Sequence, residues 1–299
     1  MLRRILSGGL KRALGPLEES SAQYWTRHNV TNHHQFLSAD ESLDYMECRN
    51  DQYVYYIQLM PVSGHDGKVI LDYGCGPGHD LVGFATCSKP LRLIAMDVSA
   101  TSLEEARHRL RLHGAIADFI LIVERDDKLP LDDSSVDLIH CSGVLHHTPD
   151  PLRILCEFRR VLKQNGNAQI MVYNYDSVFL HLYVGYTKMI LEREFSGKSV
   201  QEAFSKLTDG PDCPISRCYR PDEFKAMAKE AGFNAEFLGC AVSTSEMQML
   251  PRRYEALLDR RLRGESRRFL ANLTFDERGC PVYNGYSAGV DGCYRLIAT

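Results

Sequence analysis

The sequence lacks any apolar run long enough to cross a bilayer. No stretch of 18 or more consecutive apolar residues occurs, whereas a spanning helix needs about 20. The ten cysteines include no CxxC pair and no histidine and cysteine cluster with zinc-ligand spacing, which argues against structural zinc or another metal centre. Scattered cysteines of this kind are usually small buried residues of a reducing compartment. We therefore expect a cytoplasmic protein without a transmembrane helix or disulfides.

An excess of positive charge is also missing. The 35 Lys and Arg residues are outnumbered by 39 Asp and Glu residues, so the net charge is -4 at pH 7. No chain-wide cationic field attracts phosphate backbones, which argues against a nucleic-acid substrate. Residues 1–14 are nonetheless basic and amphipathic. They suggest a weak membrane-surface contact or an organellar presequence, although we favour a helix packed on its own domain or a frayed terminus.

From residue 68 onward, short β-rich apolar runs alternate with amphipathic helical patterns. This alternation is typical of βα units and a mostly parallel sheet. We therefore predict an α/β fold of Rossmann-like type, with helices on both faces of the sheet. The predicted strands lie at residues 68–71, 91–96, 119–123, 136–140, 168–173, 235–238 and 293–297.

Three segments lie outside this alternation. Residues 1–60 are predicted to form a helical N-terminal cap, and residues 61–299 form the main domain, into which segments 176–215 and 246–289 are inserted. Ligands of open parallel sheets bind in the crevice beyond the carboxyl ends of the strands. We therefore expect the cap and the two insertions to fold over that crevice as a lid.

The most informative run is segment 69–78, Val-Ile-Leu-Asp-Tyr-Gly-Cys-Gly-Pro-Gly. An apolar strand ends in Asp72, and three alternating glycines follow before a helix begins. Glycine tolerates positive φ and lets backbone approach a ligand closely. A dinucleotide fingerprint would place Gly or Ala at position 79, where His79 stands. An acid before the loop also disfavours a phosphate, so the loop predicts a ligand that offers a cation or hydroxyl groups.

A second acid stands at a matching place. Asp97 ends the predicted strand 91–96 and lies 19 residues beyond Gly78. Rossmann-like folds place there the acid that accepts hydrogen bonds from both ribose hydroxyls. The alternative is that Asp97 or Ser99 caps the following helix. We favour the ribose contact because it agrees with the glycine loop.

A third motif follows the fourth predicted strand. Residues 137–151 are Asp-Leu-Ile-His-Cys-Ser-Gly-Val-Leu-His-His-Thr-Pro-Asp-Pro. Together with the loop at 71–78 and the strand end at Asp97, this segment resembles class I S-adenosylmethionine-dependent methyltransferases of the type 11-like group, which act on small molecules or glycans. The resemblance is strongest over residues 66–175. It implies S-adenosyl-L-methionine as cofactor and a seven-stranded sheet whose last strand, at 293–297, is antiparallel.

The resemblance also implies roles for single residues. Asp72 and the loop backbone would hold the amino and carboxylate end of the methionine, Asp97 the ribose hydroxyls and Val98 the adenine. The family's acid for the adenine amino group falls on Arg125, so Asp126 takes the role with a one-residue shift, the backbone does so, or the segment is a solvated charged loop. The implied cofactor-binding residues are Asp72, Gly74, Cys75, Gly76, Gly78, Asp97, Val98 and Asp126.

A hydroxyl acceptor loses its proton as it attacks a methyl group, and histidine is the usual base near neutral pH. His146 and His147 follow the strand predicted at 136–140, where the crevice opens. We expect one of them to be the general base, although the first could instead pack against the glycine loop or cap a turn. Unless they only form a turn, the residues that follow the next strand are predicted to orient the substrate: Asn174, Tyr175 and Asp176.

Arginines are concentrated in the second insertion, where residues 252–268 contain seven arginines and three acids. If Arg260 and Arg261 face the crevice, the acceptor is anionic; we favour a solvated helix face. The sequence as a whole predicts methyl transfer from S-adenosylmethionine to a hydroxyl oxygen of a small molecule or glycan by in-line displacement. The alternatives are carbon or nitrogen methylation of a natural-product-like acceptor, and a cofactor-binding partner protein without catalysis.

Overall fold

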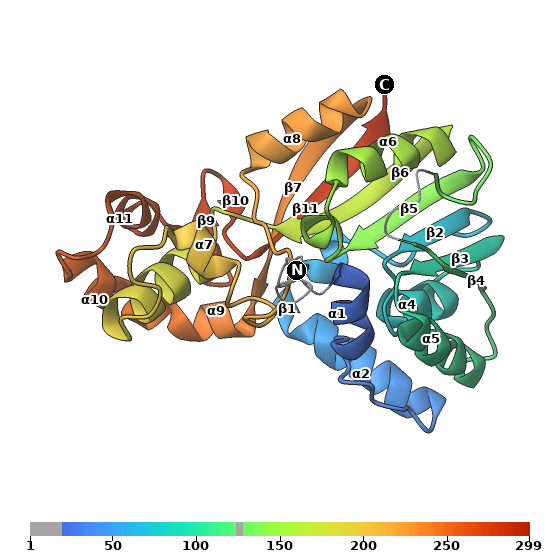
Figure 1. Ribbon diagram of the computed structural model, residues 1–299, viewed down its shortest axis with the longest axis horizontal. Coiled ribbons are helices and arrows are strands. Elements are labelled where there is room, and N and C mark those ends of the chain that lie inside the picture. Colours follow the sequence, from blue (N-terminus) through green and yellow to red (C-terminus); the bar gives the residue numbers. More distant parts are fainter. Residues whose placement is uncertain (1–19, 124–127) are drawn as a thin grey trace, which may run out of the picture.

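The computed structural model describes residues 20–123 and 128–299. Its centre is an eight-stranded sheet with the order β1-β7-β11-β6-β5-β2-β3-β4 (Figure 1). The strands are β1 (Tyr53–Val54), β2 (Val69–Tyr73), β3 (Arg92–Asp97), β4 (Asp118–Leu121), β5 (Val136–Ser142), β6 (Leu162–Tyr173), β7 (Phe233–Ser243) and β11 (Asp291–Ala298). The predicted α/β fold is confirmed.

The strands from β4 to β6 are parallel, and β11 runs antiparallel between β6 and β7. This confirms the predicted antiparallel last strand. The sheet has one strand more than the predicted seven because Tyr53 and Val54 pair with Ser243 and Val242 at its edge. The extra strand brings residues of the N-terminal segment to the carboxyl edge of the sheet.

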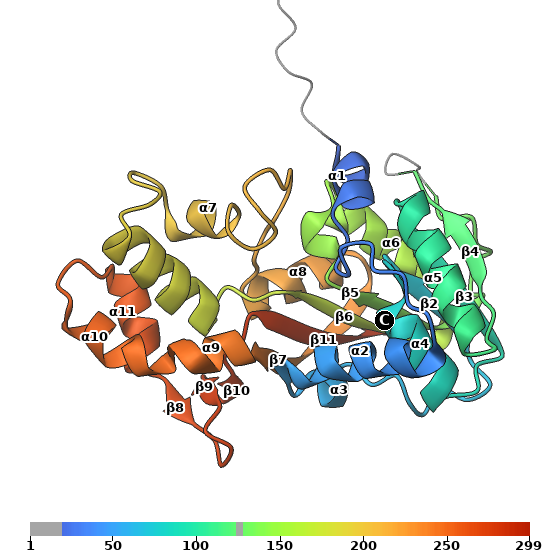
Figure 2. The ribbon, with the colours of Figure 1, turned by 90° about the horizontal axis from the view of Figure 1, so that it is seen from below.

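Helices cover both faces of the sheet (Figure 2). Ile70 and Leu138 point into one core with α2, α4 and α5, whereas their neighbours Leu71 and Ile139 point into another with α6 and α8. Successive side chains of a strand face opposite ways, so a sheet covered on both sides requires continuous apolar runs. The helices of this part are α1 (Ser21–Arg27), α2 (Ala39–Asp51), α3 (Tyr56–Leu59), α4 (His79–Cys87), α5 (Ala100–Leu112), α6 (Pro151–Val161) and α8 (Pro221–Glu230).

The two insertions form a lobe beside the carboxyl edge of the sheet, on the left of Figure 1. Tyr186 from the first insertion and Phe269 from the second share one apolar core, so the segments pack on each other. The elements of the lobe region are η2 (Phe179–Leu191), α7 (Val200–Phe204), α9 (Thr244–Met249), η3 (Leu250–Arg252), α10 (Arg253–Leu258), α11 (Gly264–Ala271), β8 (Thr274–Phe275), β9 (Pro281–Tyr283) and β10 (Tyr286–Ser287). The last three form a small second sheet.

Within the described residues, no helix combines the length and apolar character needed to cross a membrane. All ten cysteines are free thiols. Residues 1–14, for which we considered a membrane-surface contact, lie outside the described residues.

Candidate active site

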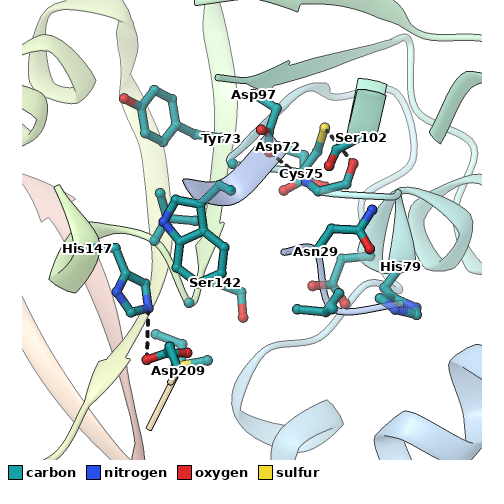
Figure 3. A pocket seen from close by; sticks show the side chains of 18 of the residues that line it. Asn29, Asp72, Tyr73, Cys75, His79, Asp97, Ser102, Ser142, His147 and Asp209 are labelled. Carbon is teal, nitrogen blue, oxygen red and sulfur yellow. Dashed lines mark hydrogen bonds and ion pairs between the residues drawn. The ribbon is translucent and has the colours of Figure 1, made fainter. Parts of the chain in front are cut away.

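A cavity of about 620 Å³ opens at the carboxyl ends of β2, β3, β5 and β6 (Figure 3). Helices α1 and α2, strand β1 and the first residue of β11 complete its wall. The first insertion contributes Phe179, Thr208 and Asp209 to the lining, and the second contributes no lining residue within the described chain. Most of the lobe therefore lies beside the cavity and does not cover it.

The glycine loop forms one wall of the cavity through Gly74, Cys75 and Gly76. The backbone of Gly74 has φ 74°, and a Cβ at this position would lie 2.2 Å from a methyl carbon of Val144. Only glycine fits there without displacing the chain after β5. Gly78 lies outside the lining residues; it adopts φ 84° and caps α4, and a Cβ there would lie 3.1 Å from Ala106. Gly78 therefore shapes the loop and has no direct place in the wall.

Two carboxyl groups face the cavity from the ends of β2 and β3. Asp72 is buried, burial raises the pKa of its carboxyl to about 7, and its Oδ2 has no hydrogen-bond partner among the described residues. Asp97 accepts the N–H of Gly76 at 2.8 Å and the N–H of Ser99 at 2.8 Å. The helix cap belongs to Ser99, whose Oγ accepts the N–H of Ser102. Asp97 is therefore free to use its remaining lone pairs on a ligand.

The cavity continues past Val98 to apolar residues that follow β4 and begin α6, including Ile122, Leu129 and Ile154. Apolar lining of this kind, which here stands beside Lys128, Arg153 and Glu157, suits an aromatic base. Asp126, for which the resemblance implied the adenine contact with a one-residue shift, lies outside the described residues, as does Arg125.

The two histidines of η1 (Leu145–His147) differ in their surroundings. His146 is fully buried and does not line the cavity; its ring packs on Tyr173 with ring centroids 3.9 Å apart, and burial holds its pKa well below the usual range. His147 lines the cavity beside Trp25. Of the two histidines, only His147 is placed where it could act as the expected general base.

The hydrogen bonds of His147 define its tautomer. Its Nδ1 lies 2.7 Å from the carbonyl oxygen of Ile215, and because a carbonyl only accepts, Nδ1 carries the proton and Nε2 the lone pair. Nε2 lies 3.6 Å from a carboxylate oxygen of Asp209 (Figure 3). Burial lowers the pKa of His147, while Asp209 opposes this. The ring is thus neutral near pH 7. The Asp209 carboxylate is close enough to stabilise the protonated form of the ring.

Cys213 lies beside this pair, and one ligand atom each of His147, Asp209 and Cys213 falls within 4.8 Å of the others. The thiol donates to the Ile215 carbonyl at 3.3 Å, and burial raises the pKa of Cys213 to about 11. In this arrangement the three groups form a hydrogen-bonded cluster in which the thiol is protonated.

A polar network below the loop was not predicted from the sequence. Asp80, in the first turn of α4, pairs with Arg49 of α2 and with His140 of β5 at 3.0 Å, and it accepts the Tyr56 hydroxyl at 3.1 Å. Although burial opposes its charge, Arg49 and His140 hold the pKa of Asp80 well below its usual range. The acid directly after the glycine loop was the available signal, but its partners come from distant parts of the chain.

Two further acids of the lining were also missed, Asp209 of the first insertion and Asp291 at the start of β11. Asp209 follows helix α7 and Asp291 begins strand β11, in sequence that is typical of turns. Acids are common in turns because they hydrogen-bond nearby backbone groups. Their place at the cavity depends on tertiary packing, so no local signal distinguishes them.

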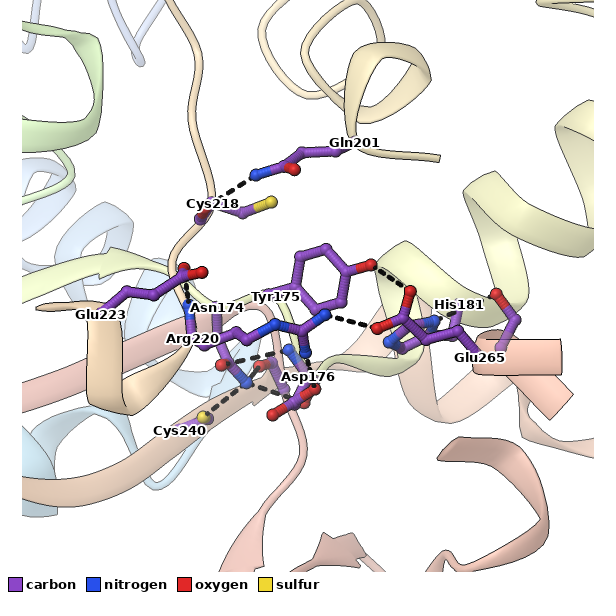
Figure 4. Close-up of polar contacts among 12 residues, drawn as sticks. Asn174, Tyr175, Asp176, His181, Gln201, Cys218, Arg220, Glu223, Cys240 and Glu265 are labelled. Carbon is purple, nitrogen blue, oxygen red and sulfur yellow. Dashed lines mark hydrogen bonds and ion pairs between the residues drawn. The ribbon is translucent and has the colours of Figure 1, made fainter. Parts of the chain in front are cut away.

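The predicted substrate-orienting residues Asn174, Tyr175 and Asp176 do not line the cavity. Figure 4 shows them joining the sheet to the lobe: Asn174 donates to the carbonyl of Gly289, the Tyr175 hydroxyl donates to Glu265, and Asp176 pairs with Arg220. The chain leaving β6 turns toward the lobe and carries these side chains away from the cavity. The structure uses these side chains to join the sheet to the lobe and gives the predicted substrate-orienting role no support.

Arg260 and Arg261 are also not part of the cavity. Both are exposed on the lobe after α10, and Arg261 pairs with Asp259 at 2.6 Å. Nearby, Arg253 and Arg267 donate to carbonyl oxygens at helix ends. The cluster is a solvated surface with structural hydrogen bonds, so it gives no support to an anionic acceptor.

Residues 71–170 match the family described as "Methyltransferase domain". A 37.1 kDa protein of transposon TN4556 from Streptomyces fradiae is 36% identical over 125 residues, which cover 41% of this chain and 35% of that protein. The ubiquinone biosynthesis O-methyltransferase of Thiobacillus denitrificans is 27% identical over 172 residues, covering 58% of this chain and 67% of the enzyme. The chain therefore spans between a third and two thirds of these relatives.

Among solved structures, one chain of the complex between the Trm112 methyltransferase activator and a methyltransferase of Haloferax volcanii has a similar fold. The TM-score is 0.51 at 18% identity, and the match covers 87% of this chain and 95% of that one. At this identity the likeness concerns the fold alone. Because it covers 87% of the chain, it extends well beyond residues 71–170.

Proposed function

We propose that the chain transfers a methyl group from S-adenosylmethionine to a small molecule, because residues 71–170 match the methyltransferase-domain family. The observation that carries the proposal is the cavity wall formed by Asp72, the glycine loop and Asp97. These groups stand at the carboxyl edge of a parallel sheet, where such folds bind ligands.

The donor atoms of this wall fit the cofactor. The unpartnered Oδ2 of Asp72 is a buried acceptor in need of a donor, which a ligand ammonium group supplies. The backbone of Gly74 and Gly76 can approach a ligand without a Cβ between them. Asp97 is fixed by two backbone N–H groups and retains lone pairs for ribose hydroxyls. Val98 and the apolar residues beyond it would hold the adenine.

When bound, S-adenosylmethionine supplies an electrophilic methyl group on a positive sulfur. The chain's own contribution is to orient the acceptor in line with that group and to receive the acceptor's proton. We assign the proton to Nε2 of His147, which holds the lone pair because Nδ1 donates to Ile215. Asp209, 3.6 Å from Nε2, stabilises the imidazolium that forms.

A hydroxyl oxygen is the acceptor atom that best explains this base. Hydroxyl groups lose a proton during methylation, and a neutral histidine paired with a carboxylate is suited to accept it. The name of the Thiobacillus relative, an O-methyltransferase, is compatible with the same assignment. We also propose a reducing, cytoplasmic setting, because the ten cysteines are free thiols.

The test compares His147→Gln with His34→Gln, which changes an exposed histidine of the N-terminal segment. Turnover is measured as S-adenosylhomocysteine formed with a panel of phenolic and aliphatic alcohols, and affinity for S-adenosylhomocysteine is measured in parallel. We expect His147→Gln to reduce turnover about a hundredfold or more with unchanged affinity, and His34→Gln to behave as the wild type. Full turnover in His147→Gln would reject the base assignment, and no turnover with any acceptor in the wild type would count against methyl transfer to hydroxyls.

A further inference from the structure

We propose that the methyl acceptor carries a protonated amine, which pairs with the carboxylate of Asp291 inside the cavity. The inference rests on the proposed function and deepens it, since it names the chemistry that the acceptor half of the same site recognises.

Asp291 occupies an unusual place for an acid. As the first residue of the antiparallel strand β11, it pairs with Tyr173 at the carboxyl edge of the sheet and lines the cavity. The residue is 5% exposed, and within the described residues its carboxyl group is influenced by burial and by the charges of Glu246, Arg49 and Asp209 but by no hydrogen bond. A buried carboxyl without a partner is unfavourable. Because it faces a cavity, a ligand group can provide the missing partner.

The titratable groups around Asp291 are mostly acids. Glu246 of α9 and Asp209 of the first insertion add negative charge when ionised, although burial raises the pKa of Glu246 to about 7, and Arg49 of α2 is the opposing cation. Arg49 is already paired with Asp80 and stacked on the Tyr56 ring at 4.6 Å. The result is that burial, reinforced by Glu246, raises the pKa of Asp291 to about 8. A docking cation would relieve this unfavourable environment.

The other lysine and arginine of the lining stand on different elements of the cavity wall from Asp291. Lys128 follows β4 and Arg153 lies on α6. They are the sequence neighbours of Leu129 and Ile154, which belong to the apolar lining assigned to adenine. Glu157, which also lines that end, pairs with Arg160. At the other end an anionic acceptor would meet Asp209 and the carboxyl group of Asp291.

Aromatic side chains complete the acceptor half. Tyr53, Tyr173, Phe179 and Trp25 line the cavity, and the Tyr173 hydroxyl donates to Asp209 at 3.0 Å. Aromatic faces attract cations and stack on rings. Tyr53 and Tyr173 both lie within the field of Asp209 and Asp291. A ring-bearing amine satisfies the charge and the apolar surface together, whereas a neutral glycan satisfies neither.

The test uses three phenols of similar size on protein saturated with S-adenosylhomocysteine: tyramine, its neutral alcohol analogue 4-(2-hydroxyethyl)phenol, and the anion 4-hydroxyphenylacetate. Binding is measured by calorimetry at pH 7. We expect tyramine to bind about ten- to a hundredfold more tightly than the neutral analogue, as for a charge-assisted hydrogen bond, and the anion to bind most weakly. Asp291→Asn should reduce tyramine affinity to that of the neutral analogue. Equal affinities for all three, or no binding by any of them, would overturn the proposal.

Asp132→Asn is the matched control, because it removes an exposed carboxyl outside the cavity; it should leave the amine preference intact. Affinity for S-adenosylhomocysteine reports on the fold and cofactor site of both variants, and we expect it to be unchanged. If the wild type does not bind S-adenosylhomocysteine, the proposed function fails and this inference with it. If it binds S-adenosylhomocysteine but shows no amine preference, only the present inference fails.

A second measurement identifies the group that pairs with the amine. Because the carboxyl of Asp291 is largely protonated at pH 7, binding of tyramine should release a substantial fraction of a proton. Calorimetry in two buffers of different ionisation enthalpy measures this number. Release in the wild type that is absent in Asp291→Asn supports the pairing; equal release in both would contradict it.

Discussion

Replacing Asp97 by alanine should weaken cofactor binding about a hundredfold. In the folded chain each carboxylate oxygen of Asp97 already accepts one backbone N–H, from Gly76 and Ser99, both at 2.8 Å. One further lone pair on each oxygen remains for a ribose hydroxyl. Two hydrogen bonds to a charged acceptor contribute about 3 kcal/mol together, which corresponds to roughly a hundredfold in Kd.

Asp97→Ala should also destabilise the fold, because the backbone N–H groups of Gly76 and Ser99 lose their buried acceptor. Ser99→Ala separates the two effects. It removes the hydrogen bond from the Ser102 N–H and lowers stability by about 1 kcal/mol, yet it leaves the Asp97 carboxylate and the Ser99 backbone N–H that this carboxylate accepts in place. Calorimetric titration with S-adenosylhomocysteine and thermal unfolding are measured on both variants. A folded Asp97→Ala protein whose Kd stays within about threefold of the wild type would refute the ribose assignment.

Three further predictions follow from individual groups. Gly74→Ala should lower the free energy of unfolding by about 2 kcal/mol or more, because φ is 74° and the added methyl group would lie 2.2 Å from a methyl carbon of Val144. The control Gly114→Ala, with φ 64° but open space around it, should lower the free energy of unfolding by about 1 kcal/mol. Equal losses of Tm in the two variants would contradict this account. Asp209→Asn removes the carboxylate that opposes the lowered pKa of His147, so the acidic limb of the kcat/KM profile should move to lower pH and the maximal rate should fall; an unmoved limb would argue against His147 as the base. Since burial raises the pKa of Asp291 to about 8, its stabilising protonated form is present at low pH and lost as pH rises toward 8, so Asp291→Asn should raise Tm at pH 8.5 and change it little at pH 5; unfolding scans that show no pH-dependent difference would refute the buried-carboxyl account.

The sheet and the cofactor wall were predictable because their signals are local. Continuous apolar runs marked the parallel strands, and the sequence from Asp72 to Gly78 carries both the strand end and the backbone freedom that the loop needs. Asp97 was found by its spacing from that loop. In each case a short segment contains both the structure and the chemistry, so no knowledge of distant contacts was required.

The acceptor half was not predictable in the same way. Asp209 and Asp291 are more than 80 residues apart in the sequence and meet only because β11 inserts between β6 and β7 while the first insertion turns back over His147. Residues 174–176 show the opposite case, in which a local signal pointed to the cavity and the tertiary structure leads away from it. They end a strand at the expected edge, but the chain turns into the lobe and takes their side chains away from the cavity.

The arginine-rich segment failed as a predictor for a related reason. Charge composition alone does not distinguish a ligand-binding cluster from arginines that hydrogen-bond helix ends, as Arg253 and Arg267 do. The position of a segment relative to the cavity decides its role, and here none of the arginines at 252–268 is among the lining residues.

The central claim is that the cavity between the glycine loop and Asp97 holds S-adenosylmethionine. Calorimetric titration of the protein with S-adenosylmethionine, with S-adenosylhomocysteine and with NADH as a control ligand tests it most directly. The account predicts saturable binding of the first two at one site per chain and no binding of NADH. Binding of NADH alone, or of none of the three, would contradict it.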